Sequence, residues 1–137
     1  MYDEMMVAPM RKEVVDMGAV EMRSAAEVDA QLKDCQEPTL VFVNSVCGCA
    51  AGGARPGLKL ALQADKKPGR ITTVFAGQDR EATARAREYF VGYMPSSPQI
   101  ALIKGGRCVA MMERHDIEGR MPIEIANKLV DLFNKHC

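Results

Sequence analysis

Residues 39–49 read Thr-Leu-Val-Phe-Val-Asn-Ser-Val-Cys-Gly-Cys, and this stretch decides the fold. Its first part, Thr39–Val46, is short, β-branched and apolar, which is typical of a strand buried on both faces of a sheet. Two cysteines follow at once, and the small residues Ala50–Ala54 come next. This order predicts a strand that runs directly into a helix, with Cys47 and Cys49 at the junction.

The junction favours redox chemistry at the two thiols. A helix N-terminus offers unpaired N–H groups and a partial positive charge, and both stabilise a thiolate, the nucleophilic form of cysteine. Gly48 between the two cysteines permits the tight ring of a Cys47–Cys49 disulfide. Such a ring is expected to be strained and therefore easy to reduce. We expect Cys47, before the helix, to be the more exposed sulfur and the attacking nucleophile, with Cys49 in the first turn as the resolving thiol.

Other interpretations of the cysteines stay open at this point. Both could be small apolar packing groups, as buried free cysteines often are, and we expect that role for Cys35 and Cys108. A CxC pair also occurs in metal sites, but two thiolates are not four ligands. A metal or iron–sulfur carrier would need further ligands from His115, His136, Cys108 and Cys137. Their spacing follows no zinc pattern, so the sequence assigns no metal site.

The rest of the chain alternates between the two kinds of secondary structure. Strands are expected over Ala19–Met22, Thr39–Val46, Ile71–Phe75, Gln99–Lys104 and Arg107–Glu113. Helices are expected before Gly18, from Ser24 to Glu37, from the cysteines to about Asp65, from Asp79 to Gly92 and after Pro122. Alternation predicts an α/β fold with parallel strands, to which the Gly105-Gly106 hairpin adds an antiparallel edge. We expect one domain over residues 1–137, with residues 1–18 as an N-terminal helical extension.

Several side chains on these helices have predicted roles. Met6, Met10, Val14 and Met17 recur at helical spacing and are expected to form the packed face of the N-terminal helix. Asp79 is expected to cap the helix that follows it. Arg55, in the helix after the cysteines, is by default a solvated surface residue. Its alternative role is substrate binding, through the carboxylates of an anionic thiol.

Composition limits the class of partner. The 137 residues contain 18 basic and 18 acidic side chains. Without a basic stripe, nucleic acid is not expected as a partner, whereas a near-neutral chain is compatible with a monomer or a weak dimer. The acidic start, Met1–Glu4, is unlike a secretory signal, and the apolar runs are strand-sized, so no membrane segment is expected. We expect a cytoplasmic protein whose five cysteines are mostly reduced.

A second element lies before the Gln99–Lys104 strand. Ser96-Ser97-Pro98 places a proline at the strand start, where its missing N–H costs no ladder bond. Local sequence favours an ordinary trans peptide bond between Ser97 and Pro98, since cis bonds make up only about 5–6% of X–Pro bonds.

These motifs together resemble the bacilliredoxin family of bacteria, thioredoxin-like proteins with a CGC active site. The resemblance covers nearly the whole chain and is carried by Asn44–Gly52, Ala54–Pro56, Val74–Asp79, Pro95–Pro98, Glu113–His115, Ile117–Gly119 and Cys137. It implies a thioredoxin-like fold, in which a central mixed sheet is flanked by helices on both faces, with an extra N-terminal helix. It also makes Pro98, after Ser97, a cis-proline that faces the active-site sulfurs.

The resemblance implies removal of a bacillithiol-type cap from the cysteines of S-thiolated client proteins. Cys47 would take up the small thiol, which acts as a co-substrate, and no bound cofactor is implied. Weak disulfide isomerase activity is implied as well, so a protein disulfide isomerase or oxidant is the rival enzyme. The chain differs from thioredoxin in having no tryptophan and no carboxylate in Thr39–Val46. Proton handling is therefore expected from solvent or from Asn44 and Ser45.

Overall fold

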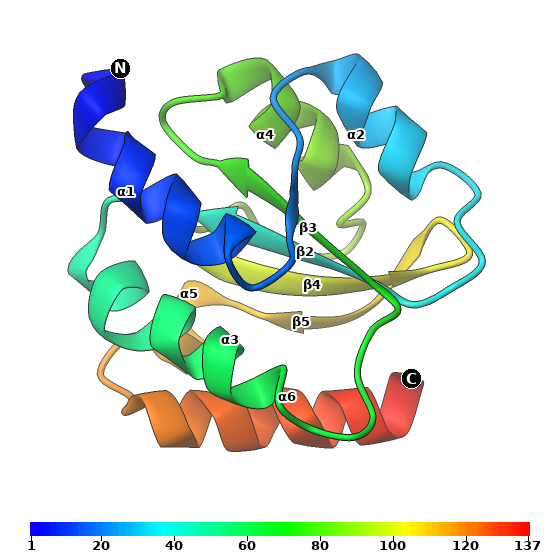
Figure 1. Cartoon of the computed structure of the whole chain (residues 1–137). Helices are drawn as coiled ribbons and strands as arrows, with labels where there is room; N and C mark the ends of the chain where they lie inside the picture. The colour runs from blue at the N-terminus through cyan, green and yellow to red at the C-terminus, as the bar shows by residue number, and fades with distance from the viewer.

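The computed structural model describes the whole chain, Met1–Cys137, as a mixed sheet covered by helices (Figure 1). The strands are β1 (Val20–Glu21), β2 (Thr39–Asn44), β3 (Arg70–Phe75), β4 (Gln99–Lys104) and β5 (Arg107–Met112). The helices are α1 (Glu4–Val15), α2 (Ala25–Leu32), the π-helical turn η1 (Ala50–Ala54), α3 (Arg55–Ala61), α4 (Arg80–Glu88), α5 (Arg114–Ile117) and α6 (Pro122–His136). No helix has the length and apolar character needed to cross a membrane.

The five strands lie in the order β1-β3-β2-β4-β5. β3 pairs in parallel with both β1 and β2, whereas β4 runs antiparallel to β2 and β5 antiparallel to β4. All six residues of β2 are buried, as expected for the strand at the centre of the sheet. The predicted combination of a parallel α/β part and an antiparallel hairpin edge is confirmed.

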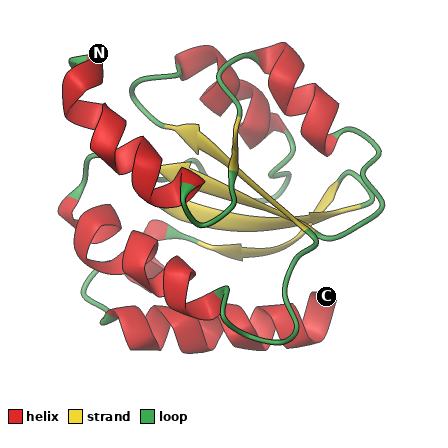
Figure 2. Ribbon diagram, in the orientation of Figure 1, coloured by secondary structure: helices red, strands yellow, loops and turns green.

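The pleat of β2 divides the interior into two cores. Leu40 and Phe42 point to the side covered by α1, α3 and α6, and Val41 and Val43 point to the side covered by α2 and α4. Figure 2 shows α2 and α4 on one face of the sheet and α3 and α6 on the opposite face. Alternating apolar residues on both faces are what a central strand requires.

Two boundaries at the junction differ from the expectation. β2 ends at Asn44 rather than Val46 because the Asn44 side chain accepts a hydrogen bond from Ser45 N at 2.9 Å, which takes that N–H out of the sheet. After the cysteines, the helical segment first widens into the π turn η1 and then continues as α3 only to Ala61. Short π segments inside helices are common at functional sites.

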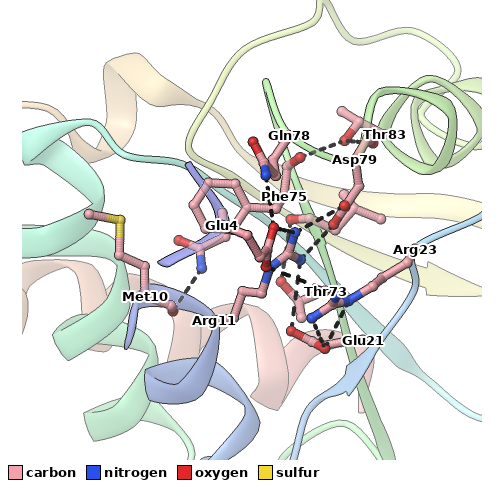
Figure 3. A network of polar contacts seen from close by, with 12 residues as sticks. Glu4, Met10, Arg11, Glu21, Arg23, Thr73, Phe75, Gln78, Asp79 and Thr83 are labelled. Atoms are coloured by element: carbon pink, nitrogen blue, oxygen red, sulfur yellow. Dashed lines mark hydrogen bonds and ion pairs between the residues drawn. The ribbon is translucent and has the colours of Figure 1, made fainter. Parts of the chain in front are cut away.

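The packed face predicted for the N-terminal helix is confirmed only in part, since Val14 is buried and Met17 packs against the core but Met6 does not. α1 buries Val7, Arg11 and Val14, whereas Met6 is 45% exposed. The reason is an ionic network: the Arg11 guanidinium donates to Asp79 Oδ2 at 2.6 Å and to Glu4 Oε1 at 2.7 Å (Figure 3). The same guanidinium lies 5.3 Å from the centre of the Phe75 ring.

The network also corrects the role of Asp79. This residue stands at the N-cap position of α4, as expected, but its side chain caps no N–H group there. Both carboxylate oxygens accept from Arg11 instead. The backbone carbonyl of Asp79 accepts from the Thr83 hydroxyl at 2.8 Å. Asp79 therefore anchors α1 to the start of α4.

Candidate active site

The two cysteines lie where β2 gives way to the helical segment. Cys47 precedes the segment and its carbonyl accepts from Ala50 N at 2.9 Å, so the helix begins on it. Cys49 lies inside the first turn, and its backbone N–H donates to Cys47 Sγ at 3.4 Å. Both cysteines are reduced and half-buried, and Gly48 between them is exposed. The expectation that Cys47 is the more exposed sulfur stays a prediction, because both cysteines are half-buried.

The environment of the two sulfurs separates their protonation states. The pKa of Cys47 is lowered, first by the backbone N–H of Cys49, then by the Cys49 side chain and by the charge of Arg114. The pKa of Cys49 is raised, first by its hydrogen bond to Cys47 and then by burial. A Cys49 thiol that donates to a Cys47 thiolate explains both directions. The thiolate is thus favoured at Cys47 over Cys49, which is the direction that the predicted roles of attacking and resolving thiol require.

A layer of polar side chains lies beneath the cysteine loop. Asn44 Oδ1 accepts from Ser45 N and from Arg55 Nη1, both at 2.9 Å, and Asn44 Nδ2 donates to Met10 O of α1 at 3.1 Å. Ser45 Oγ accepts from Cys47 N at 3.3 Å. Asn44 and Ser45 therefore hold the backbone of the loop. Their hydrogen bonds do not reach the sulfurs, so the expected role in proton handling gains no support here.

Arg55 belongs to this layer, and the expectation of a solvated surface arginine is wrong. The residue is only 3% exposed, and Nη1 donates to Ser45 O at 3.0 Å. Its Nε lies 2.6 Å from Glu13 Oε2 of α1 but makes no aligned hydrogen bond, so the contact is an ion pair without a directed N–H. A buried guanidinium needs such a partner. Binding of a substrate carboxylate by Arg55 stays a prediction.

The Ser97–Pro98 peptide bond is cis, and Pro98 is buried at the start of β4. The trans bond expected from local sequence is wrong, and the cis bond implied by the resemblance is confirmed. The preceding loop is held from both sides. Arg87 Nη2 donates to Ser96 O at 2.9 Å, and Arg114 Nη1 donates to Ser97 O at 3.3 Å.

Arg114, the first residue of α5, is a site residue to which sequence reasoning gave no role. Besides Ser97 O, its guanidinium contacts Glu118 Oε2 through Nε at 3.3 Å. Its positive charge lowers the pKa of Cys47 and also offsets part of the increase in the pKa of Cys49. The only sequence signal was its place in the Glu113–His115 segment of the resemblance. The neighbouring His115 is exposed, and its Nε2 lies 3.6 Å from Asp116 Oδ1.

The other three cysteines lie away from the helix start that carries Cys47 and Cys49. Cys35 is buried, as expected. Burial raises the pKa of Cys108 to about 11 and also raises the pKa of Cys137. No group of three or more histidine, cysteine, aspartate or glutamate side chains is placed to hold a metal ion.

Comparison with known proteins identifies the same family. A family described as disulphide isomerase matches residues 2–137. A bacilliredoxin of Geobacillus kaustophilus is 54% identical over 93% of this chain and 87% of its own length. A bacilliredoxin of Staphylococcus aureus is 50% identical over 100% of this chain and 94% of its own.

Solved structures confirm the fold. The thioredoxin of Malassezia sympodialis has a TM-score of 0.58 at 16% identity and covers 86% of this chain and 90% of its own. The thioredoxin of Fasciola hepatica has a TM-score of 0.55 at 19% identity and covers 85% of this chain and 98% of its own. With a thioredoxin fold, a CGC pair where β2 meets the following helical segment and relatives that are 50–54% identical, the chain belongs to the bacilliredoxin family and is a thiol–disulfide oxidoreductase.

Proposed function

We propose that this protein removes a low-molecular-weight thiol, of the bacillithiol type, from mixed disulfides on the cysteines of client proteins. One observation carries the proposal: the backbone N–H of Cys49 donates to Cys47 Sγ at 3.4 Å, where it lowers the pKa of Cys47, while the pKa of the neighbouring Cys49 is raised. A thiolate next to a protonated thiol fits an attack followed by a resolving step. The bacilliredoxin relatives support the same chemistry by name.

In the first step, the Cys47 thiolate attacks the sulfur of the small thiol in the capped client. The Cys47–small-thiol disulfide forms, the client–small-thiol disulfide breaks, and the electron pair leaves with the client sulfur as a thiolate. The client thiolate then takes a proton from solvent. The client cysteine is reduced, and Cys47 carries the cap.

In the second step, Cys49 loses its proton to solvent and attacks Cys47 Sγ. A Cys47–Cys49 disulfide forms and the small thiol leaves as a thiolate. Alternatively, a second small thiol attacks the cap, so that a small-molecule disulfide leaves and the Cys47 thiolate returns. Both routes are ordinary thiol–disulfide exchange and conserve electrons. We place this cycle in the bacterial cytoplasm, with S-thiolated proteins as partners.

Protein disulfide isomerisation is the second candidate function. It is favoured by the matching family, which is described as disulphide isomerase. The same Cys47 thiolate would attack a protein disulfide, and a Cys49 that keeps its proton would let the mixed disulfide live long enough to rearrange.

Serine variants of the two cysteines test the proposal. Cys47→Ser should abolish transfer of the cap from a client, because it removes the thiolate that attacks the cap. Cys49→Ser should perform the first transfer and then accumulate the adduct on Cys47, which mass spectrometry detects. A first transfer that survives Cys47→Ser but not Cys49→Ser would reverse the roles.

Two assays separate the remaining alternatives. Wild-type protein is given a capped client and, separately, a protein with scrambled disulfides; faster turnover of the scrambled protein would favour isomerisation. Metal analysis after anaerobic purification under reducing conditions addresses the carrier alternative. Near-stoichiometric metal that is lost in Cys47→Ser would contradict the redox assignment.

A further inference from the structure

A groove lies between the loop that precedes β4 and the short helix α5. It is lined by Met94, Ser96, Glu113, Arg114, His115 and Glu118. Its volume is about 360 Å³, within the range of sites that hold small molecules. The walls are thus formed by the segment that leads to the cis-proline and by the helix that carries Arg114.

Arg114 brings free hydrogen-bonding capacity to this groove. A guanidinium has five N–H donors. Arg114 uses Nε toward Glu118 and Nη1 toward Ser97 O, and no protein group accepts from Nη2. The side chain is 43% exposed. Its remaining donors can therefore pair with a carboxylate that enters the groove, in the planar geometry that arginine favours.

The position of Arg114 links the groove to the reacting sulfurs. Its contact with Ser97 O places the guanidinium at the cis-proline loop, and its charge acts on both Cys47 and Cys49. β4 pairs with β2 through Gln99 and Val43, so the cis-proline loop lies beside the end of β2, from which the cysteine loop starts. The groove that Arg114 lines therefore opens on the side of the molecule that carries the cysteine pair.

We propose that this groove is the binding subsite for the cap, and that Arg114 recognises a carboxylate on it. The ligand class is a low-molecular-weight thiol that bears a carboxylate. This inference rests on the proposed function and adds a specificity-determining residue to it. Glu118 pairs with Arg114 Nε at 3.3 Å, so its negative charge competes with the carboxylate of the cap for the same guanidinium, although the two would use different N–H groups.

Matched caps test the proposal. A single-cysteine client is capped with N-acetylcysteine or with N-acetylcysteine amide, which differ in the carboxylate, and the full-length protein removes each cap. Arg114→Gln should slow removal of the carboxylate cap about fivefold to tenfold more than removal of the amide cap. Any change in the thiolate of Cys47 affects both caps, so the ratio of the two rate constants isolates recognition.

Glu118→Gln is a second variant, and it should change the ratio of the two rate constants in the opposite direction. It removes the competitor, so the carboxylate cap should be removed about twofold to threefold faster relative to the amide cap. This variant also decides the question if Arg114→Gln does not fold. Arg120→Gln is the matched control, because Arg120 pairs with Glu124 at the same i,i+4 spacing as Arg114 with Glu118. Its rate ratio should equal that of the wild type.

The outcomes keep the two proposals distinguishable. If Arg114→Gln slows both caps equally, or if Glu118→Gln leaves the ratio unchanged, the subsite is overturned while cap removal by Cys47 stands. If the wild-type protein removes neither cap, the proposed function fails first and the subsite fails with it.

Discussion

At the scale of single residues, the active site depends on one N–H and one S–H group. Cys47 and Cys49 are two residues apart at the start of a helix. The backbone N–H of Cys49 therefore donates to Cys47 Sγ, and the Cys49 thiol lies beside the same sulfur. No buried carboxylate or tryptophan is needed for this arrangement. The charge difference between the two sulfurs follows from local geometry, with Arg114 as the external cation.

Replacing Cys49 tests this geometry. Cys49→Ala removes the S–H donor but keeps the backbone N–H, so the pKa of Cys47 should rise and the thiolate fraction at neutral pH should fall. Cys49→Ser keeps a hydroxyl donor, so the pKa of Cys47 in this variant should stay closer to that of the wild type. Labelling of Cys47 with iodoacetamide from pH 5 to 10, quantified by mass spectrometry, measures the pKa of Cys47 in the three proteins. Indistinguishable profiles for the three proteins would show that the Cys49 side chain does not act on Cys47.

The cysteine pair could be predicted from sequence because its chemistry is local. Arg55 and Arg114 could not. The charge partner of Arg55, Glu13, lies on α1, and Arg114 reaches the site only because the fold brings α5 to the Ser97 carbonyl. The sequence around a charged residue on a predicted helix does not reveal partners that are distant along the chain. Most such residues are exposed to solvent, so exposure is the prediction that the sequence favours.

At the scale of elements, the position of the active-site helix depends on close packing between α3 and α6. A Cβ added at Gly57 would lie 2.8 Å from Ile125 Cγ2 and 2.9 Å from Ile125 Cβ. Glycine is therefore required where these helices touch, although glycine inside a helix normally destabilises it. The contact fixes α3, which continues the turn that starts at the cysteines.

Gly57→Ala should lower the free energy of unfolding by about 1–2 kcal/mol, since overpacking exceeds the gain in helix propensity. Gly52→Ala is the control within the same helical segment, because an added Cβ there meets nothing within 4 Å. It should raise the free energy of unfolding by about 0.5–1 kcal/mol. Urea denaturation measures both, and equal effects of the two substitutions would contradict the packing argument.

The regular elements were predictable where one pattern dominates. Gln99–Lys104 forms β4 with its expected bounds, and Ser24 caps α2 through Glu27 N at 3.2 Å, as its capping-box sequence indicates. Methionine spacing predicted the packed face of α1 only in part: Val14 is buried, whereas Met6 is exposed and Arg11 is buried in its place. Hydrophobic periodicity does not register an ion pair such as that of Arg11. The π turn η1 was also missed, since its small residues favour an ordinary helix equally.

At the scale of the whole molecule, α1 ties together segments that are far apart in sequence. Arg11 binds Asp79 at the start of α4, Met10 O accepts from Asn44 at the end of β2, and Glu13 pairs with Arg55. The N-terminal helix thus contacts Asn44 and Arg55, the two side chains that hold the backbone of the cysteine loop. Since Arg11 is buried, loss of its partner would leave a charge in the interior.

Asp79→Asn should therefore lower the free energy of unfolding by about 2–3 kcal/mol, with Glu4 compensating for part of the loss. Asp131→Asn, an exposed site on α6, is the control and should change it by less than about 0.5 kcal/mol. Chemical denaturation of both variants decides the matter. An Asp79→Asn protein as stable as the control would mean that α1 is not anchored through this pair.

The most direct test of the central claim is labelling of the reduced wild-type protein with limiting iodoacetamide across pH, with each cysteine quantified by mass spectrometry. Cys47 should be labelled first, with a midpoint below the value of about 8.5 for free cysteine, and Cys49 should follow only at higher pH. Preferential labelling of Cys49, or a Cys47 midpoint at or above that of free cysteine, would contradict the claim that Cys47 is the stabilised thiolate.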